Sequence, residues 1–432
     1  MNAVEYLFSL ETLGIKFGLD GIRALLGALD HPQRQYPRVI VAGTNGKGSV
    51  TVMTETALRA AGHRVGRYTS PHLARLEERF VIDGRTVSSA ELAGAAETVR
   101  AAATRLVAEG RLSGPPTFFE ATTAVGFELF RRAGIGVAVV EVGLGGRLDA
   151  TNAEPSIAAA ITSIDRDHEQ FLGSDLAAIA REKAGVVHPG MVAVLGDRKS
   201  EVVAAVTAVC RERGARLVTT TGTSVEAAME AGRARLVLET ARRRYGPVRL
   251  GLRGRHQIEN AVTAVLLLEE LEALGLALSP AAIEAGLAGA RWPGRLEVVR
   301  VGGALVLFDA AHNPGGARAL ADHLAAEHPQ GLPIVFGAMR DKDARGMLAL
   351  LAPVASAFAL TEARIARASP AAALAQEAAA VAPEVPRVAL PDREQALAWA
   401  LERSPVVVVA GSIFLVGDLR AALLARGGQP EE

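Results

Sequence analysis

Short apolar runs alternate with longer amphipathic stretches along most of this chain, which is the pattern of a parallel α/β protein. In the first part of the chain, strands are predicted near residues 38–43, 64–68, 136–141, 157–162 and 191–195. Helical periodicity predicts helices near residues 48–61, 88–109, 119–133, 175–184 and 199–213. The stretch 215–255 is less regular, and the run Arg242-Arg243-Arg244 within it is interpreted as a solvated turn.

A second alternation of strands and helices follows a break in this pattern. A Leu- and Ala-rich helix is predicted after Asn260, and the segment Arg291-Trp292-Pro293-Gly294-Arg295 then favours a connection between domains. Strands are predicted beyond it near residues 304–308, 333–336, 356–360, 387–389 and 405–410. The pattern therefore predicts an N-terminal α/β domain over residues 1–290, with a mostly parallel sheet, and a smaller Rossmann-like α/β domain over residues 291–432.

The first predicted strand runs into a glycine-rich turn, residues 43–49, ahead of a predicted helix. Glycines allow the backbone to turn tightly and to aim several N–H groups at a bound anion. Lys47 offers a charge for the outer phosphates of a nucleotide, and the hydroxyl of Ser49 can join a magnesium shell. The spacing differs from the usual phosphate loop, because Gly43 stands only three residues before Gly46 and Gly48 separates the lysine from the serine. The turn predicts an ATP site and disfavours a switch GTPase or an ordinary kinase.

Lysine is scarce among the basic residues. The 47 basic residues comprise five lysines (16, 47, 183, 199 and 342) and 42 arginines. A lysine kept against this bias suggests a need for a compact amine that can lose its proton, which arginine does not provide. We therefore single out Lys47, Lys183 and Lys342 as candidates for chemistry.

The charge balance disfavours nucleic acid and membranes as partners. The 47 acidic residues equal the basic ones, so no overall field attracts nucleic acid or anionic lipid. No apolar run approaches the roughly 20 residues that a membrane span needs, and the N-terminus lacks the pattern of a signal peptide. Cys210 is the only cysteine, so no disulfide can form within the chain and a reducing, cytoplasmic compartment is expected.

Further polar residues follow predicted strands, where ligands bind in open parallel sheets. Glu141 ends the run 136–141 in the position of a magnesium-binding acid, and His168 follows the run 157–164. A lone histidine near a strand end is more often structural than metal-bound, so this position alone leaves both roles open. The stretch 143–152 superficially resembles a dinucleotide fingerprint, but no helix is predicted to open there, so nicotinamide and flavin cofactors are rejected.

Taken together, these stretches resemble the folylpolyglutamate synthase/dihydrofolate synthase family of the Mur ligase superfamily. The matching motifs, in family order, include Ala42–Ser49, Thr69–Leu73, Phe118–Glu120, Glu141–Asn152, Asp165–Gly173, Arg181–Gly185, His256–Ala261, Trp292–Glu297, Asp309–Pro314 and Gly411-Ser412. Ala310 stands where the family usually has glycine, and Gly126 where alanine is common. The first departure affects the turn before His312, where the resemblance places glutamate.

The resemblance implies an ATP-dependent amide ligase with a phosphate-loop ATPase domain of the Mur ligase type and a C-terminal glutamate-binding domain. It implies that ATP is held by Gly43, Thr44, Asn45, Gly46, Lys47, Gly48 and Ser49 of the loop, together with Asn260, Arg295 and Asp309. It implies two Mg²⁺ sites with ligands from Ser49, Ser70, Glu141, His168 and Lys183, the lysine being carbamylated. The implied catalytic residues are Lys47, Lys183, His168 and His312. His72, Phe118 and Phe119 are expected beside a pterin, and His312 and Ser412 beside glutamate.

The implied substrates are ATP, L-glutamate, and dihydropteroate or a reduced folate, and a monomer is the family expectation. Whether the enzyme is a dihydrofolate synthase, a folylpolyglutamate synthase or both stays open at this point. Two alternatives remain, a cell-wall Mur-type amino-acid ligase and a phosphate-loop ATP-binding module that ligates nothing. A catalytically silent homologue is disfavoured because Lys47, Glu141, His168 and Lys183 are all present.

Overall fold

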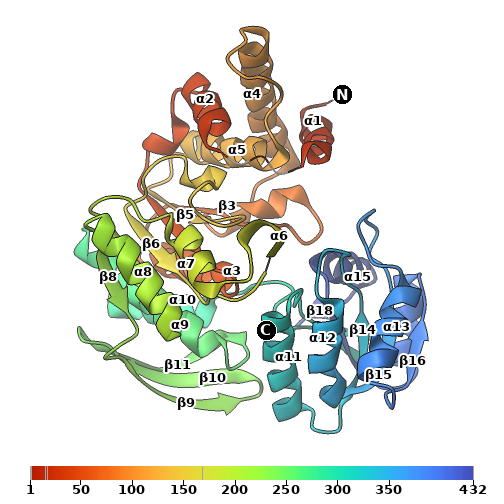
Figure 1. The fold of residues 1–432 in the computed structure, drawn as a ribbon. Helices are drawn as coiled ribbons and strands as arrows, with labels where there is room; N and C mark the ends of the chain where they lie inside the picture. Colours follow the sequence, from red (N-terminus) through yellow and green to blue (C-terminus); the bar gives the residue numbers. More distant parts are fainter. Residues whose placement is uncertain (1, 15, 17, 168, 432) are drawn as a thin grey trace. The chain divides into compact units, whose positions relative to one another are not determined.

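The computed structural model describes residues 2–14, 16, 18–167 and 169–431, and the chain divides into two compact units (Figure 1). The first unit comprises Met1–Glu226, Val237–Val248 and Glu259–Ala290, and the second comprises Ala227–Leu236, Arg249–Ile258 and Arg291–Glu432. Each unit is built around its own, mostly parallel sheet. The predicted fold class, two α/β parts with mostly parallel sheets, is confirmed.

The first unit contains an eight-stranded sheet in the order β4-β3-β2-β5-β1-β6-β7-β8. Its strands, in that order, are Arg85–Thr86, Phe80–Ile82, Val65–Tyr68, Val137–Glu141, Arg38–Ala42, Ala158–Ile161, Val192–Leu195 and Arg216–Thr219. Neighbours from β2 to β8 pair in parallel, whereas β3 and β4 are antiparallel additions that the sequence pattern missed. The central strands are buried Val-, Ile- and Ala-rich runs, as expected for a sheet covered on both faces.

Helices pack on this sheet (Figure 1), and two of the hydrophobic cores between them are defined by buried residues of the described chain. One core joins β2 and β5 to α1 (Ala3–Ser9), α2 (Asp20–Ala28), α4 (Ser89–Ala108) and α5 (Phe118–Ala133), and the other joins β1, β6 and β7 to α7 (Leu176–Ala184) and α8 (Ser200–Glu212). The remaining helices are α3 (Lys47–Ala60), α6 (Glu169–Leu172), α9 (Gln257–Ala273) and α10 (Pro280–Gly289). Local chemistry sets their ends. For example, Thr117 and Glu120 form a capping box that starts α5, and Gly134 ends it in the left-handed conformation.

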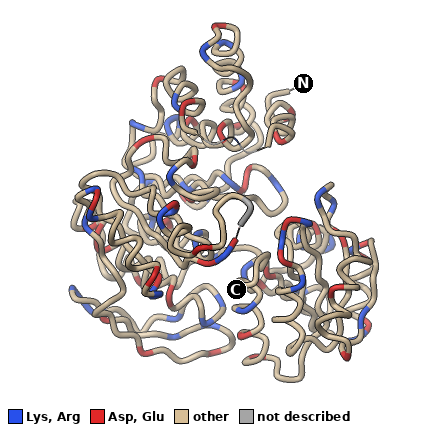
Figure 2. Tube along the Cα trace, in the orientation of Figure 1, with Lys and Arg blue, Asp and Glu red and all other residues tan. Residues whose placement is uncertain are grey.

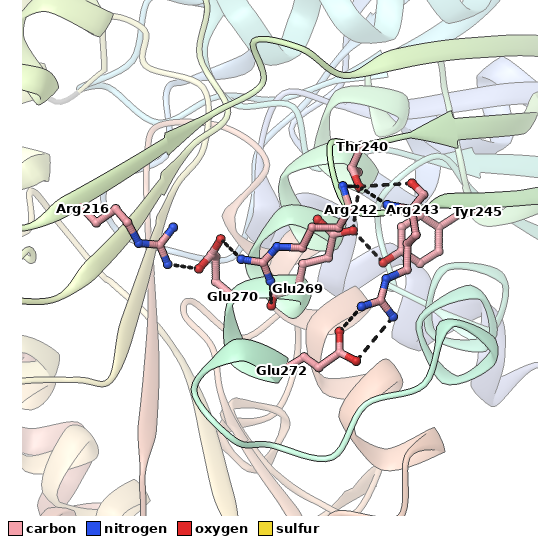
Figure 3. A network of polar contacts seen from close by, with 8 residues as sticks. All are labelled: Arg216, Thr240, Arg242, Arg243, Tyr245, Glu269, Glu270 and Glu272. Carbon is pink, nitrogen blue, oxygen red and sulfur yellow. Dashed lines mark hydrogen bonds and ion pairs between the residues drawn. The ribbon is translucent and has the colours of Figure 1, made fainter.

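In the irregular stretch 215–255, residues 216–219 form β8 of the large sheet, and residues 224–253 form a three-stranded sheet in the order β11-β10-β9. The strands are β9 (Ser224–Glu230), β10 (Arg233–Glu239) and β11 (Arg244–Arg253). The interpretation of the arginine run as a solvated turn is wrong for two of its members, because Arg242 pairs with Glu270 at 2.7 Å and Arg243 donates to Glu272 (Figure 3). These ion pairs hold the β10–β11 turn on α9.

The second unit contains a seven-stranded sheet in the order β16-β15-β14-β17-β13-β12-β18. Its strands, in that order, are Arg387–Ala389, Ala355–Leu360, Leu332–Phe336, Val406–Ala410, Ala304–Phe308, Glu297–Val301 and Gln429–Pro430. Neighbours from β16 to β13 are parallel, and the antiparallel strands β12 and β18 were not predicted. Its helices are α11 (Pro314–Glu327), α12 (Ala344–Leu351), α13 (Ala371–Val381), α14 (Arg393–Leu401) and α15 (Ile413–Ala425).

Acidic and basic residues are interspersed along the trace of both units, in keeping with the formal net charge of zero (Figure 2). Within the described part of the chain, no helix combines the length and the apolar character needed to cross a membrane.

Candidate active site

The phosphate loop joins the central strand β1 to α3, and two of its glycines adopt conformations that exclude a side chain. Gly43 has φ 142° and Gly46 has φ 88°. A Cβ atom on Gly43 would lie 1.9 Å from Thr162 Oγ1, and one on Gly46 would lie 2.3 Å from Asn260 Oδ1. Glycine is therefore required at both positions by backbone conformation and by close packing.

Hydrogen bonds to the segment that follows β6 fix the first half of this loop. The backbone N–H groups of Thr44 and Asn45 both donate to the carbonyl of Ser163, at 2.7 and 3.4 Å. Thr162 Oγ1 donates in turn to the carbonyl of Asn45 at 2.7 Å. The amides of residues 44 and 45 thus hold the loop itself.

The backbone amides at the start of α3 lie before the first hydrogen bond of the helix. The first hydrogen bond of helical spacing runs from the N–H of Val50 to the carbonyl of Gly46, at 3.0 Å. The amides of Lys47, Gly48 and Ser49 precede it, at the helix end that attracts anions. These three residues are the part of the loop best placed to bind phosphate.

Two lysine side chains converge on one carbonyl of the loop. Lys47 Nζ donates to the carbonyls of Gly43 and Thr44 at 3.2 and 3.1 Å, and Lys183 Nζ, from α7, donates to the carbonyl of Gly43 at 2.9 Å. Lys183 is only 6% exposed. Burial, together with the nearby charge of Lys47, lowers the pKa of Lys183 to about 7. Lys183 is therefore a buried amine that is close to losing its proton at neutral pH.

The structure describes some, but not all, of the residues expected to bind metal. Glu141 ends β5 and is 5% exposed, and its Oε2 accepts a hydrogen bond from the N–H of Ser70 at 3.3 Å. Ser49 is buried in the first turn of α3. His168 lies outside the described residues. Among those described, no group of three or more His, Cys, Asp or Glu residues has the geometry of a metal site. The buried carboxylate of Glu141 and the serine hydroxyls are nevertheless oxygen donors of the kind that Mg²⁺ prefers.

The loop after β5 is organised by Asp149, a carboxylate within the motif Glu141–Asn152 for which the sequence predicts no role. Asp149 accepts hydrogen bonds from the amides of Gly143 and Leu144, at 3.0 and 2.9 Å, and from Thr151. Burial raises the pKa of this carboxyl group. The turn ends in a 3-10 helix, Ala150–Asn152, and not in a long helix that could face a dinucleotide. The rejection of nicotinamide and flavin cofactors stays a prediction.

The residues expected beside a pterin form two separate groups of contacts around the start of α5. Arg79 Nε donates to His72 Nδ1 at 3.0 Å, and the Arg79 guanidinium lies 5.1 Å from the ring centre of Phe118. Burial, followed by the charge of Arg79, lowers the pKa of His72 to about 4, so this imidazole is neutral at pH 7. Phe118 also stacks on Phe8 of α1, at 6.0 Å between ring centres, a contact that no sequence motif predicts. Phe119 is separate from this group.

Phe119 lies against the loop after β5 and against β2. Its ring centre is 6.3 Å from that of Tyr68. A Cβ on Gly143 would come within 2.5 Å of the Phe119 ring, so glycine is needed there for the aromatic side chain to approach the backbone.

In the second unit, Asp309 organises the chain at the end of β13. Its carboxylate accepts hydrogen bonds from the amides of Leu296 and Ala311, both at 2.9 Å. Burial raises the pKa of Asp309, and the charge of Arg295 opposes this shift. Ala310, the departure from the family motif, is 1% exposed and is not among the described residues with positive φ, so the turn accepts alanine.

The glutamate candidates lie near helix starts in the same unit. His312 Nδ1 is 2.8 Å from the carbonyl of Ala310, and Asn313 Oδ1 accepts from the N–H of Gly316 to cap α11. Ser412 caps α15 by accepting from the N–H of Phe414 at 3.2 Å. Both caps leave further backbone N–H groups at a helix N-terminus, which is favourable for a carboxylate.

The fold and the phosphate loop define the class of protein: a nucleotide-dependent ligase of the Mur ligase type. Residues 84–268 match the Mur ligase middle domain, and residues 294–413 match the Mur ligase glutamate ligase domain. The chain belongs to the folylpolyglutamate synthase/dihydrofolate synthase family.

Several relatives support this assignment. The chain is 30% identical to the dihydrofolate synthase/folylpolyglutamate synthase of Bacillus subtilis over 431 residues, which cover 98% of each chain. It is 38% identical to the Mycobacterium tuberculosis enzyme of the same name over 365 residues, or 79% of this chain and 74% of the relative. A Halobacterium salinarum relative, a probable bifunctional folylpolyglutamate synthase/dihydropteroate synthase, is 37% identical over 97% of this chain, but the chain spans only 51% of that relative's length.

Solved structures are similar over the whole chain. The Mycobacterium tuberculosis folylpolyglutamate synthase complexed with ADP has a TM-score of 0.91 and 34% identity, and the match covers 100% of both chains. An Escherichia coli structure in complex with DHPP and ADP has a TM-score of 0.87 and 30% identity, covering 99% of each chain.

Proposed function

We propose that this chain joins L-glutamate to dihydropteroate, to reduced folates that already carry glutamate, or to both, with ATP converted to ADP and phosphate. The observation that carries the proposal is the phosphate loop, in which Lys47 and Lys183 converge on one carbonyl beside the free end of α3. Relatives support the substrates, since the Escherichia coli structure holds DHPP and ADP, and a Yersinia pestis structure holds Mn, AMPPNP and L-glutamate. Residues 1–290 would bind ATP and residues 291–432 would bind glutamate.

The reaction needs no nucleophile from the protein. The carboxylate of the pterin substrate attacks the γ-phosphorus of ATP, the bond to ADP breaks, and an acyl phosphate forms. The amine of glutamate then attacks the acyl carbon, phosphate leaves, and the nitrogen loses a proton as the amide forms. Lys47 and the amides of residues 47–49 would hold the β- and γ-phosphates and neutralise the charge that moves to ADP.

The remaining residues of the site have positioning and binding roles in this proposal. Two Mg²⁺ ions would be held by Ser49 at the first site and by Ser70, Glu141, His168 and Lys183 at the second, and they would screen the phosphate charge. The nucleotide would be surrounded by Asn260, Arg295 and Asp309. The pterin would contact His72, Phe118 and Phe119, and glutamate would contact His312 and Ser412. The single cysteine, Cys210, fits a reducing cytoplasmic compartment.

Lys183 would act as a carbamate in this scheme. Its neutral amine attacks CO₂, an N–C bond forms, and a proton leaves, so that a cation becomes an anion able to bind a metal. With its pKa lowered to about 7 from the 10.5 of an ordinary lysine, a substantial part of this amine is neutral at pH 8. The buried site thus favours the form of the amine that reacts with CO₂.

Carbon-13 NMR in labelled bicarbonate tests the modification. A carbamate resonance is expected in the parent protein and not in a Lys183→Arg variant, and the variant should lose most ligase activity. A free amine in the parent, together with an active arginine variant, contradicts this part of the proposal.

An assay of ADP release tests the ligase function itself. Turnover should require both a pteroate compound and L-glutamate, and mass spectrometry should find the glutamylated product. Dihydropteroate and tetrahydrofolate are compared as acceptors, which decides between the two activities. ATP hydrolysis that is independent of pteroate refutes the proposal and favours a binding module, whereas turnover that needs a uridine nucleotide-sugar favours a cell-wall ligase.

A further inference from the structure

An ion pair beyond β7 encloses the backbone of a single residue, Ile164. The N–H of Ile164 donates to Asp197 Oδ2 at 2.7 Å, and the carbonyl of Ile164 accepts from Lys199 Nζ at 2.8 Å. Lys199 Nζ also donates to Asp197 Oδ2 at 2.8 Å, which closes the ring. The second carboxylate oxygen, Oδ1, accepts from the N–H of Lys199 and fixes the turn that carries both side chains. We call Asp197 and Lys199 the Ile164 clamp.

The residues on either side of Ile164 hold the phosphate loop. The carbonyl of Ser163 accepts from the amides of Thr44 and Asn45. The hydroxyl of Thr44 donates to the carbonyl of Asp165 and accepts from its N–H, both at 3.0 Å. The segment 163–165 is therefore bound on one side to the phosphate loop and on the other side to the Ile164 clamp.

We propose that Asp197 and Lys199 are positioning residues for nucleotide binding, which act on the phosphate loop through the backbone of residues 163–165. This inference rests on the proposed ATP site. Neither side chain needs to touch the nucleotide. The clamp fixes the carbonyl of Ser163 and the backbone of Asp165, and these in turn fix Thr44 and Asn45, directly before the amides that would receive phosphate.

The burial of the two side chains indicates that the clamp is sensitive to substitution. The Asp197 side chain is only 2% exposed, whereas that of Lys199 is 46% exposed. An exposed ion pair contributes little by itself, but removing the lysine would leave a buried carboxylate without its counter-ion. The carbonyl of Ile164 would lose its side-chain partner at the same time.

The clamp also explains why a lysine is kept at position 199 in a chain that otherwise uses arginine. One ammonium nitrogen donates to a carbonyl and to a carboxylate oxygen that are themselves linked through Ile164. A guanidinium is planar and larger, with its donors spread over three nitrogens. Lys199→Arg therefore keeps the charge but should not restore the closed ring.

The experiment compares Asp197→Asn, Lys199→Met, Lys199→Arg and the double variant Asp197→Asn/Lys199→Met with the parent. Arg198→Met is the matched control, because Arg198 stands between the two residues and donates instead to Thr220 Oγ1 at 3.0 Å. For each protein, the Kd of ADP is measured by calorimetry, the KM values of ATP and L-glutamate by ADP release, and stability by urea denaturation.

Loss of one or two hydrogen bonds of the clamp should raise the Kd of ADP and the KM of ATP by about 5- to 20-fold. The KM of L-glutamate should change less than about twofold, since its expected residues are fixed elsewhere. The double variant should resemble the single variants, because the ring is already broken once. Lys199→Arg should fall between parent and Lys199→Met, and Arg198→Met should resemble the parent.

Unchanged ADP affinity in folded clamp variants overturns the proposal, whether or not their stability falls. An equal rise in every KM, in proportion to lost stability, overturns it too, because it indicates a merely structural role. A parent that binds ADP but does not ligate glutamate would refute the proposed function and leave the clamp testable by the ADP measurement.

Discussion

Replacing Gly46 by alanine should be costly because two independent penalties meet at this residue. Its φ of 88° lies in the left-handed region, where an alanine costs roughly 1–2 kcal/mol more than glycine. The new Cβ would also lie 2.3 Å from Asn260 Oδ1, and relief of such a contact in a packed site costs about 1–3 kcal/mol. We expect Gly46→Ala to lower the free energy of unfolding by about 2–4 kcal/mol in urea denaturation and to weaken ADP binding at least tenfold.

A double-mutant cycle separates the two penalties. Asn260→Ala removes the clashing oxygen, so in the Gly46→Ala background it should be about 1–2 kcal/mol less harmful than in the parent. The backbone penalty should remain in both backgrounds. Additive effects of the two substitutions, or a Gly46→Ala variant within about 0.5 kcal/mol of the parent, would refute this account of the loop.

Three further substitutions test the packing and the charges of both units. His323 is 8% exposed, and mainly burial lowers its pKa to about 4. Its neutral form therefore stabilises the fold above pH 6.5, and up to about 3 kcal/mol of unfolding free energy is lost as the pH falls toward 4. Urea denaturation at pH 7.5 and pH 5 should show a smaller loss of stability in His323→Gln than in the parent. Tyr245→Phe removes the hydrogen bond to the buried carboxylate of Glu269 (Figure 3), measured at 2.9 Å, and should cost about 1.5–3 kcal/mol of unfolding free energy. Gly126→Ala places a Cβ 3.1 Å from Tyr68 Cδ2, but alanine favours the helix by about 1 kcal/mol over glycine. Because these two effects oppose each other, we expect an unfolding free energy within about 1 kcal/mol of the parent. A loss above about 3 kcal/mol would contradict this balance.

The elements that position the phosphate loop could be predicted because their own residues encode them. The strand β1 is a buried run of Val and Ile, and α3 begins directly after Gly46, so a period change and a glycine mark the boundary. The strand β9 lacks such a pattern, whereas in β10 the buried residues Ala234, Leu236 and Leu238 alternate with more exposed ones over only a short run. In β9 most side chains are exposed, so no apolar alternation marks it as a strand. The arginines of the β10–β11 turn were misinterpreted because their partners, Glu270 and Glu272, follow about 30 residues later.

The site was predictable as a set of residues but not as a set of contacts. Motif spacing identified Gly46 and Asn260 separately, yet only the fold brings the amide oxygen of Asn260 to the place where a Cβ of residue 46 would stand. Asp149 was likewise quoted as part of a loop, while its role in binding the amides of residues 143 and 144 depends on a buried turn. Phe8 belongs to none of the sequence motifs. Its stacking on Phe118 depends on packing between α1 and α5 that no local pattern encodes.

The contacts of three lysines suggest why lysine, and not arginine, stands at their positions. Three of the five lysines, Lys47, Lys183 and Lys199, use Nζ to donate to backbone carbonyls at or beside the phosphate loop, those of Gly43, Thr44 and Ile164. A main-chain carbonyl in a tight turn offers one small acceptor, which suits a compact ammonium better than a planar guanidinium with five donors. The composition therefore indicated more than a titratable amine. Lysine suits these positions because the backbone around the phosphate loop is crowded, and a criterion of reactivity alone does not single out Lys199.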